Sequence, residues 1–428
     1  MNRKERFKMA EVYTFEENGE LFSFDINNMT VSHDEFHEST AIVNTERTRN
    51  DICRIKFMSL HVAHECPLYC EYCYGSGGEY DTPSMRMSRS TMMQAVDYLF
   101  KYCTNDNIVH INFFGGEPLL AFDLIKECVE YSEDKAKKYG KKIEFSVSTS
   151  ALVISQEIID FISQHNFSVS VSIDGTKYAH DKHRKFRNQN TSYDKVVAGF
   201  KQLMEKNDNI LITATLTHHT IDEIIKYHDL LDIGANNFRF KTVTGMTSDI
   251  KLVDEDYDRL ATMYERLAKM YLDDILEGKI YDFGDFTKWL HRLNKKKTVH
   301  FNCTATEDYL NVDPNGEIYI CHKYVGIPNG RLGNVYQIDS PVKPLGFDTE
   351  IGKCRNCWAH NLCGGGCYYD GFETTGNSYH TCNTNKCKIH RSQIKAAIYI
   401  YYHLKQRGLL DSFLQSITSA SNAYQLTV

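Results

Sequence analysis

The nine residues Cys66-Pro-Leu-Tyr-Cys70-Glu-Tyr-Cys73-Tyr74 place three cysteines at intervals of four and then three positions. They follow an apolar run, Ile55–His61, that is typical of a β-strand, so we expect the cysteines on a short loop directly after it. Three thiolates this close together can bind three irons of a 4Fe–4S cube and leave the fourth iron without a protein ligand. Because a small molecule could bind and be reduced at an open iron, the spacing predicts a reactive cluster.

The strand before the cysteines begins a regular alternation of strand and helix patterns. Six β-then-α units in sequence predict an α/β fold with a parallel sheet and helices outside it. Right-handed crossovers make such a sheet either doubly wound or curled toward a barrel, and six units are two short of a complete eight-fold barrel. We therefore expect a partial (β/α)6 TIM-like barrel, open enough for a bulky substrate. The predicted strands are Ile55–His61, Ile108–Phe114, Ile143–Thr149, Val169–Ile173, Ile210–Leu216 and Asn237–Val243, and the predicted helices are Ser88–Tyr102, Asp123–Tyr139, Gln156–His165, Ser192–Lys206, Asp222–Leu231 and Asp254–Gly278.

Polar and glycine-rich residues follow these strands at their carboxyl ends, where parallel α/β folds place their ligands. The second strand ends in Gly115-Gly116-Glu117-Pro118, the third in Ser148-Thr149-Ser150 and the fourth in Ser172-Ile-Asp174-Gly175. Each stretch alone is weak evidence, since Gly-Gly and Asp-Gly pairs are usually plain turns. Their recurrence on consecutive strands predicts a binding site at this edge of the sheet, beside the cysteines.

The composition is that of an ordinary soluble globular protein of 428 residues, with 42% hydrophobic and 25% charged residues. A net charge of −7 argues against nucleic acid or an anionic membrane surface as the main partner. No apolar run is long enough for a membrane span, and the charged start Met-Asn-Arg-Lys-Glu-Arg-Phe lacks the apolar stretch of a signal peptide. These features favour a cytoplasmic enzyme.

Fourteen cysteines are too many for an ordinary chain of a reducing compartment, where disulfides are rare. Eight of them lie beyond residue 300, which favours metal or iron–sulfur ligation there. Viewed alone, the pair Cys354-Arg-Asn-Cys357 serves zinc, redox and cluster sites alike, so a zinc ribbon stays open as an alternative. Three others, beside predicted core elements, are expected to be ordinary buried thiols: Cys53, Cys103 and Cys128.

The N-terminal stretch Val12–Asp25 alternates apolar and polar residues around the pair Asn18-Gly19, which predicts a β-hairpin. Such a hairpin either caps a sheet edge or offers an edge to which an extended peptide adds as a further strand. Near the other end, Ser392–Lys405 has the pattern of an amphipathic helix.

With these motifs in place, the chain resembles the radical S-adenosylmethionine (SAM) enzymes with a SPASM extension, over about residues 52 to 405. The first motif is Cys66-x3-Cys70-x2-Cys73 followed by Gly115-Gly116-Glu117-Pro118, and the second is the long C-terminal series of cysteines. The chain is most similar to maturases that form thioether crosslinks in cysteine-rich ribosomal peptides, of the ranthipeptide or SCIFF type. Five short stretches carry that likeness: Leu60-His-Val-Ala-His64, Asp308-Tyr-Leu-Asn-Val-Asp313, Cys321-His-Lys-Tyr-Val-Gly326, Leu332-Gly-Asn-Val335 and Cys357-Trp-Ala.

The resemblance implies that Cys66, Cys70 and Cys73 hold a cluster whose open iron chelates the amino and carboxylate groups of SAM. One electron into the sulfonium then yields methionine and a 5′-deoxyadenosyl radical. The implied contacts to SAM are Tyr72 near the adenine, Gly115, Gly116 and Glu117 at the methionine ammonium, Ser148, Ser150 and Asp174 at the ribose and methionine ends, and Arg184 at the carboxylate.

Two of these assignments leave alternatives. Arg184 could instead make an ordinary surface ion pair. Relatives often have Thr-Asn-Gly after the third strand, where this chain has Thr149-Ser150-Ala151. The resemblance therefore does not assign the atom of SAM that Ser150 would contact.

The resemblance also implies two auxiliary 4Fe–4S clusters. Cys354, Cys357, Cys363 and Cys387 would hold an outer cluster with a full set of ligands. Cys303, Cys321 and Cys367 would hold an inner cluster whose fourth iron either stays open for a substrate thiolate or takes Cys382, which could also exchange roles with Cys387.

The implied organisation is an N-terminal hairpin region over residues 1–50, a radical SAM barrel over 51–280 and a SPASM domain over 281–428. The implied substrate is a ribosomally made precursor peptide with a leader and a cysteine-rich core, and an electron donor such as flavodoxin or ferredoxin would supply the reducing electron. Rival outcomes are formylglycine formation on a sulfatase, a carbon–carbon peptide crosslink or, from a different class, a non-catalytic zinc-rich binding protein.

Overall fold

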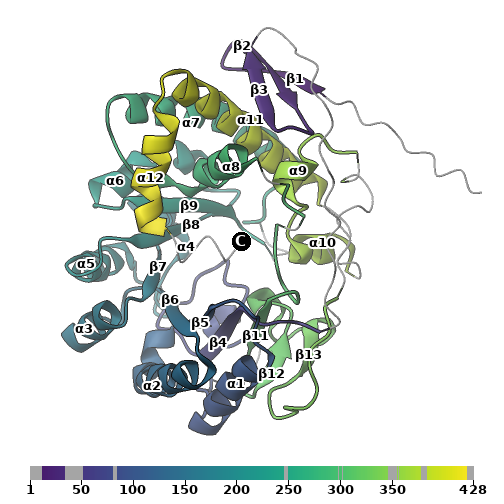
Figure 1. Ribbon diagram of the computed structural model, residues 1–428. Coiled ribbons are helices and arrows are strands. Elements are labelled where there is room, and N and C mark those ends of the chain that lie inside the picture. Colours follow the sequence, from purple (N-terminus) through teal and green to yellow (C-terminus); the bar gives the residue numbers. More distant parts are fainter. Residues whose placement is uncertain are drawn as a thin grey trace, which may run out of the picture. The chain divides into compact units, whose positions relative to one another are not determined.

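The computed structural model describes residues 12–33, 52–80, 84–244, 249–296, 298–300, 302–345, 354, 356–376 and 383–421 (Figure 1). The chain divides into two compact units. We call Arg49–Leu252 with Thr304–Gly346 and Ala420–Val428 the larger unit, and Met1–Thr48 with Val253–Cys303 and Phe347–Ser419 the smaller unit. The predicted functional division at residues 50 and 280 stays a prediction.

The larger unit contains the six predicted strands, each paired in parallel with the next. In the sheet they run in the order β9-β8-β7-β6-β5-β4. Helices of the crossovers lie along the outer face of this sheet (Figure 1). The predicted α/β fold with a mainly parallel sheet is confirmed. The elements are β4 (Phe57–Ala63), α1 (Arg89–Tyr102), β5 (Ile108–Gly115), α2 (Phe122–Tyr139), β6 (Lys142–Thr149), α3 (Gln156–Gln164), β7 (Ser168–Ser172), α4 (Lys177–His183), α5 (Tyr193–Met204), β8 (Ile210–Leu216) and β9 (Asn237–Thr242).

Three features of this unit differ from the sequence prediction, and the first is helix α4, which was not predicted. The helix expected at Asp222–Leu231 is a 3₁₀ helix, η3 (Ile221–Lys226), followed by the short α6 (His228–Asp232). The sheet also extends past β4, where β11 (Tyr309–Val312) pairs in parallel with it and continues antiparallel into β12 (Glu317–Tyr319) and β13 (Arg331–Asn334). These strands are three or four residues long, which is too short for a periodic signal.

Hydrogen-bonded polar side chains connect three central strands of the sheet. Asn112 on β5 donates to the hydroxyl of Ser59 on β4 over 3.1 Å and accepts from Ser146 on β6 over 2.8 Å. All three residues are buried, as is every residue of β4. Ser148, the predicted SAM contact, lies two positions beyond Ser146 on β6 and therefore on the same face of the strand.

The smaller unit begins with a three-stranded antiparallel sheet of β1 (Val12–Glu17), β2 (Glu20–Asp25) and β3 (Thr30–His33). The predicted hairpin is confirmed, with Asn18 and Gly19 at φ 51° and 77°, while β3 was not predicted. The sheet packs on α11 (Thr384–Gln406), which contains the predicted helix Ser392–Lys405, and the ring of Tyr13 stacks on Trp358 at 4.2 Å. The other helices are α7 (Asp254–Leu276), α8 (Gly284–Lys295), α9 (His360–Cys363), α10 (Tyr368–Thr375) and α12 (Leu410–Ser421).

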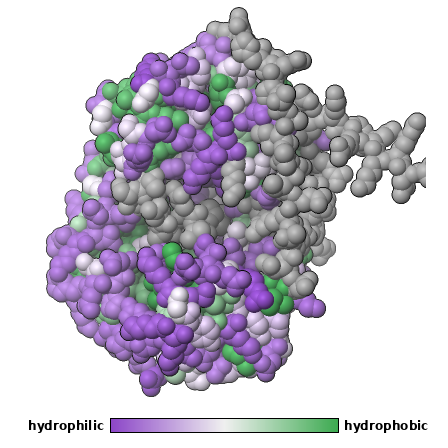
Figure 2. All heavy atoms as spheres, viewed as in Figure 1, coloured by the Kyte–Doolittle hydropathy of each residue, from purple (hydrophilic) through white to green (hydrophobic). Residues whose placement is uncertain are grey.

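Hydrophilic residues predominate on the surface over α2, α3 and α5 (Figure 2). Their apolar residues, among them Ile125, Ile158 and Val196, are buried on the inward side. Within the described part of the chain, no helix combines the length and apolar character needed to cross a membrane.

Candidate functional site

The cysteine loop follows β4 and is held by backbone hydrogen bonds to the segment after β7. The amide of Tyr69 donates to the carbonyl of Lys185 over 2.8 Å, and that of Glu71 donates to the carbonyl of His183 over 3.1 Å. Within the loop, the amide of Cys73 donates to the carbonyl of Cys70 over 3.0 Å, which closes a turn between the last two cysteines. The loop is thus fixed between the end of β4 and the segment that follows β7.

Two glycines let β5 end in close contact with the cysteine loop. A Cβ on Gly115 would lie 2.2 Å from the carbonyl oxygen of Ala63, and a Cβ on Gly116 would lie 2.3 Å from that of Glu65. Gly78 makes a similar approach, since its Cβ would lie 2.9 Å from the Cβ of Cys66. Packing of the loop therefore requires these glycines, independently of any approach of SAM.

The predicted SAM ligand Glu117 is completely buried and already has four hydrogen-bond donors. Its Oε1 accepts from the hydroxyl of Thr149 over 2.8 Å and from the amide of Leu119 over 3.2 Å. Its Oε2 accepts from the amide of Ser150 over 2.8 Å and from the Ser150 hydroxyl. Burial raises the pKa of Glu117, and the hydrogen bonds from Ser150 and Thr149 oppose that shift. The structure thus brings Glu117 and Ser150 together at the ends of two strands.

Ala151, the second of the two residues that depart from the Thr-Asn-Gly pattern, adopts a left-handed backbone conformation with φ 57°. This conformation costs an alanine more than a glycine, because Cβ approaches the backbone. The amide of Ala151 donates to Thr149 Oγ1 over 3.0 Å, which holds the turn in this shape. The backbone therefore keeps a shape suited to glycine although the residue has changed.

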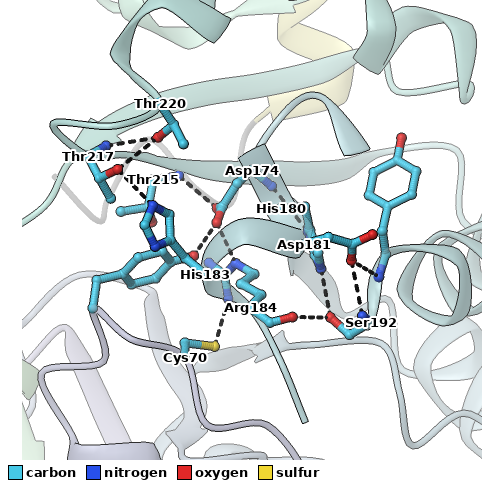
Figure 3. A network of polar contacts seen from close by, with 12 residues as sticks. Cys70, Asp174, His180, Asp181, His183, Arg184, Ser192, Thr215, Thr217 and Thr220 are labelled. Atoms are coloured by element: carbon cyan, nitrogen blue, oxygen red, sulfur yellow. Dashed lines mark hydrogen bonds and ion pairs between the residues drawn. The ribbon is translucent and has the colours of Figure 1, made fainter. Parts of the chain in front are cut away.

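Three other predicted residues meet beside Cys70. Asp174, at the end of β7, accepts hydrogen bonds at Oδ2 from Tyr72 and from Arg184 Nε, the latter over 3.0 Å (Figure 3). Its Oδ1 accepts from the amide of Thr215 over 2.9 Å. Arg184 Nη1 lies 4.0 Å from Cys70 Sγ, and its guanidinium lies 5.2 Å from the centre of the Tyr72 ring. The alternative of a surface ion pair for Arg184 is wrong, since the Arg184 and Asp174 side chains are only 11% and 1% exposed.

Burial dominates the protonation of this cluster of side chains. It raises the pKa of the Cys70 thiol to about 12, although the guanidinium of Arg184 acts in the opposite direction. Burial also raises the pKa of the Cys66 thiol, and the neighbouring Glu117 raises it further. Thiolates at these positions therefore need a compensating positive charge, which bound iron supplies.

Two histidines of α4 support this network, and the sequence analysis missed both. His183 Nδ1 lies 2.8 Å from the carboxylate of Glu71. Its Nε2 lies 2.9 Å from the hydroxyl of Thr217 (Figure 3). His180 Nε2 lies 3.0 Å from the hydroxyl of Ser192, and burial lowers the His180 pKa to about 3. Both belong to the stretch His180-Asp-Lys-His-Arg184, from which only the arginine had been singled out.

The four cysteines predicted for an outer cluster all belong to the smaller unit. The amide of Cys357 donates to the carbonyl of Cys354 over 3.1 Å, and Cys363 ends the short helix α9. Gly364 follows at φ 66°, where a Cβ would lie 2.7 Å from Val299. Cys387 lies in the first turn of α11, whose N-terminus is capped by Asn383. Their common assignment to one cluster stays a prediction.

The cysteines predicted for an inner cluster are divided between the units. Cys303 and Cys367 belong to the smaller unit and Cys321 to the larger one, while Cys382 lies outside the described residues. Among the described residues, no three His, Cys, Asp or Glu side chains are grouped so that they could hold a metal ion. The inner ligand set therefore also stays a prediction.

The donor chemistry of the larger unit fits a cluster that binds SAM. Cys66, Cys70 and Cys73 are free of disulfides, and they lie beside a buried carboxylate and a buried guanidinium. These two groups match the ammonium and carboxylate of an amino acid in charge.

Comparison with known proteins agrees with this site. Residues 60–231 match the family model described as the radical SAM superfamily. The chain is 26% identical over 335 residues to the cysteine-type anaerobic sulfatase-maturating enzyme of Clostridium novyi, covering 71% of this chain and 84% of that protein. It is 21% identical over 336 residues to the radical SAM cyclopropyl synthase TigE of Paramaledivibacter caminithermalis, covering 73% of this chain and 68% of that protein.

Solved structures show the same fold. The structure of native anSMEcpe with bound AdoMet matches with a TM-score of 0.68 at 20% identity, over 83% of this chain and 99% of that one. Streptococcus suis SuiB bound to S-adenosylmethionine matches with a TM-score of 0.54 at 16% identity, over 78% and 77%. The matched residues 60–231 include the cysteine loop, the Glu117 turn and the Asp174–Arg184 pair, and we conclude that the chain contains a radical SAM domain homologous to those of the anaerobic sulfatase-maturating enzymes and TigE.

Proposed function

We propose that the chain modifies a peptide, and that it forms thioether bonds between cysteine sulfurs and carbon atoms of a ribosomally made, cysteine-rich precursor. The observation that carries the enzymatic part is the buried contact of Cys70 with the Arg184–Asp174 pair at the end of β7. Support for a peptide substrate comes from the relatives, which include sulfatase-maturating enzymes and a structure of SuiB bound to precursor peptide SuiA.

The cluster and SAM together would supply a 5′-deoxyadenosyl radical that removes a hydrogen atom from a substrate carbon. The residues of this chain would bind and orient SAM. The carboxylate of Glu117 has four acceptor positions, and the structure fills all four with donors. We propose that the SAM ammonium replaces the Ser150 hydroxyl at Oε2, since rotation of that side chain frees this position at little cost.

Arg184 is proposed to bind the SAM carboxylate with the guanidinium nitrogens that Asp174 does not use. Asp174 accepts from Nε, whereas Nη1 lies 4.0 Å from Cys70 Sγ. Tyr72 would keep Asp174 in place through its hydroxyl and lie against the adenine. Gly115, Gly116 and Ser148 are proposed to line the remainder of the SAM site.

The smaller unit is proposed to contribute the outer auxiliary cluster through Cys354, Cys357, Cys363 and Cys387. Cys303, Cys321 and Cys367 are proposed to hold the inner one, either with an open iron or with Cys382. The sheet β1–β3 is proposed to help bind the leader of the precursor by adding a peptide strand. A flavodoxin or ferredoxin is proposed as the electron donor.

Formylglycine formation on a sulfatase is the second candidate, and the similarity to the Clostridium novyi enzyme favours it. Product analysis separates the two candidates. Formation of a thioether removes two hydrogen atoms from the peptide and retains the sulfur. Because the free thiol is consumed, the product no longer reacts with iodoacetamide. Formylglycine loses the sulfur and gives an aldehyde that reacts with a hydrazide.

The test uses anaerobically reconstituted protein with SAM, dithionite and either a sulfatase peptide carrying the target cysteine or a cysteine-rich precursor peptide. We expect 5′-deoxyadenosine together with a thioether in the precursor. A hydrazide-reactive sulfatase peptide would instead establish the second candidate. Zinc without iron or sulfide in the purified protein would contradict both and favour a zinc-rich binding protein.

A further inference from the structure

The two faces of the parallel sheet in the larger unit differ in chemistry. One face is apolar and completely buried, as the residues Phe113, Val147 and Ile212 on β5, β6 and β8 illustrate. The strand register places polar residues on the opposite face, among them Asn112, Ser146, Ser172, Thr213 and Thr215. The last three lie near the carboxyl ends of their strands and are partly exposed. Solvent therefore reaches the polar face at the edge of the sheet where the cysteine loop lies.

Strand β9 places two cations on this polar face. Arg239 is the register partner of Thr213, and Lys241 is the register partner of Thr215, so both side chains leave the strand on the polar side. Arg239 is half-buried, whereas Lys241, which is nearer the carboxyl end of β9, is exposed. The face thus has a positive charge at two depths.

These positive charges reach the far side of the sheet. Arg239 and Lys241 both act electrostatically on the ring of His322, which follows β12. In the order of the sheet, β8, β7, β6, β5, β4 and β11 lie between β9 and β12. The ends of such a wide sheet come close only when the sheet curls, so the polar face is its concave side. Arg239 and Lys241 therefore project into the interior of the curled sheet.

The surroundings of the two cations adjoin the proposed SAM site. The ring of His322 lies 5.0 Å from that of Phe114 at the end of β5 and 5.7 Å from that of Tyr74, the neighbour of Cys73. On the other side, the amide of Thr215 donates to Asp174 Oδ1 over 2.9 Å.

The proposed SAM site already has a cation of its own. Arg184 is paired with Asp174 and lies beside Cys70. The cations of β9 are additional to it, and a substrate that lies next to SAM would meet them.

We propose that Arg239 and Lys241 bind the carboxylate of an aspartate or glutamate side chain of the peptide substrate, and so position the neighbouring part of the peptide at the cysteine loop. A guanidinium binds a carboxylate through two parallel hydrogen bonds, and an ammonium adds a point charge. A peptide that covers the interior excludes water, so this pairing discriminates against neutral and basic residues at the same position. The inference rests on the proposed function in one respect, that the substrate is a peptide.

The test is the capture of peptides from a randomised library by the anaerobically reconstituted full-length protein. SAM is present and a reductant is left out, so that binding is measured without turnover. Every library peptide contains one cysteine and an amidated C-terminus, so that side chains are its only carboxylates. We expect the captured peptides to be enriched in Asp or Glu at one distance from the cysteine. A captured peptide should bind about tenfold more tightly than its Asn or Gln analogue.

Three variants connect this preference to β9. Arg239→Gln and Lys241→Gln should each remove most of the acidic enrichment, and Arg239→Glu should enrich Lys or Arg at the same position. A reversal of this kind would not arise from loss of structure. Lys138→Gln, an exposed change on α2, is the matched control and should keep the acidic preference. If Arg239→Gln fails to fold, Lys241→Gln provides the same test from an exposed position.

Capture of peptides without an acidic preference, or an equal loss in Lys138→Gln, would overturn this inference and leave the proposed function standing. Binding of SAM that is about tenfold weaker in Arg239→Gln and in Lys241→Gln would also overturn it, because the cations would then serve SAM. Failure to capture any peptide would overturn both proposals. An acidic preference in a protein that forms no thioether would contradict the proposed function alone.

Discussion

The two cysteine regions of this protein differ in the charges that surround them. Beside Cys70, the cation Arg184 is paired with Asp174, and Cys66 lies near the buried carboxylate of Glu117. Near Cys357 and Cys363, by contrast, three basic side chains approach from two helices. Neutral or negative surroundings favour a low reduction potential, and positive surroundings favour a high one. The comparison teaches that the same residue type, cysteine, lies in two different electrostatic environments in this protein.

The largest expected effect comes from replacing Cys70, one of the three cysteines in the loop after β4. Cys70→Ala should reduce SAM cleavage to the background level, because the proposed SAM-binding cluster would lose one of its three cysteine ligands. The measurement is 5′-deoxyadenosine formation with dithionite, with iron content as a second readout. Cys128→Ala, which replaces a buried thiol of α2 that belongs to none of the predicted clusters, is the matched control. Retained cleavage in Cys70→Ala would show that the first region has been wrongly assigned.

The charge balance beside Cys70 gives the next effect. Asp174→Ala leaves the buried guanidinium of Arg184 without its partner, which should destabilise the larger unit by about 3–5 kcal/mol. Asp174→Asn keeps a hydrogen-bond acceptor and should cost less, although it also removes the charge. The double change Asp174→Ala with Arg184→Met should recover part of the loss. Equal stability of the single and double variants in chemical denaturation would contradict the pairing.

The smaller unit contains a buried carboxyl group, that of Glu17, whose raised pKa is only partly offset by Lys395. Burial raises the pKa of Glu17 to about 8 from 4.5, with Glu265 adding to the shift and Lys395 opposing it. The folded state therefore binds this proton more tightly, so stability is highest below about pH 4.5 and falls as the pH rises toward 8.

Glu17→Gln should remove this dependence and stabilise the smaller unit by a few kcal/mol at pH 8, with little change at pH 4.5. Both tryptophans, Trp289 and Trp358, belong to the smaller unit, so their fluorescence reports its unfolding. Glu16→Gln, on the same strand, is the control. If the denaturation midpoint of the wild-type protein does not decrease as the pH is raised from 5 to 8, the raised pKa of Glu17 is contradicted.

The smallest effect concerns the turn that holds Glu117. Ala151→Gly should stabilise the larger unit by about 1 kcal/mol, because glycine adopts φ 57° at less cost than alanine. Ala179→Gly, in helix α4, should destabilise it by about the same amount. Loss of stability in Ala151→Gly would mean that the alanine side chain contributes packing that outweighs the backbone strain.

Much of the larger unit was predictable because each parallel strand pairs with a strand close in sequence. The apolar runs identified all six strands. Strand β4 begins and ends two residues later than predicted, at Phe57 and Ala63. Its residues are all buried, so no change of polarity marks its boundaries. The long-range partner β11 could not be predicted, since four residues carry no signal for a partner some 250 positions away.

The candidate site followed the same rule. Motifs that are contiguous in sequence, such as the cysteine loop and the Glu117 turn, identified their residues. His183 and Thr217 were missed because single polar residues on separate elements become meaningful only when folding brings them together. The basic residues on α8 were missed for the same reason, since a pattern such as Lys288-Trp-Leu-His-Arg292 is usual on a solvated helix face.

The contact between the first strands and the last cysteine region has a consequence for biogenesis. Asn361 donates to the carbonyl of Ile26, 335 positions earlier, and Tyr13 stacks on Trp358, the neighbour of Cys357. During synthesis, β1–β3 therefore lack these packing partners until residues 358–361 have left the ribosome. A quality-control protease could recognise the exposed N-terminal strands throughout that interval. Synthesis of α11 would end that interval, because β1 and β3 pack against it.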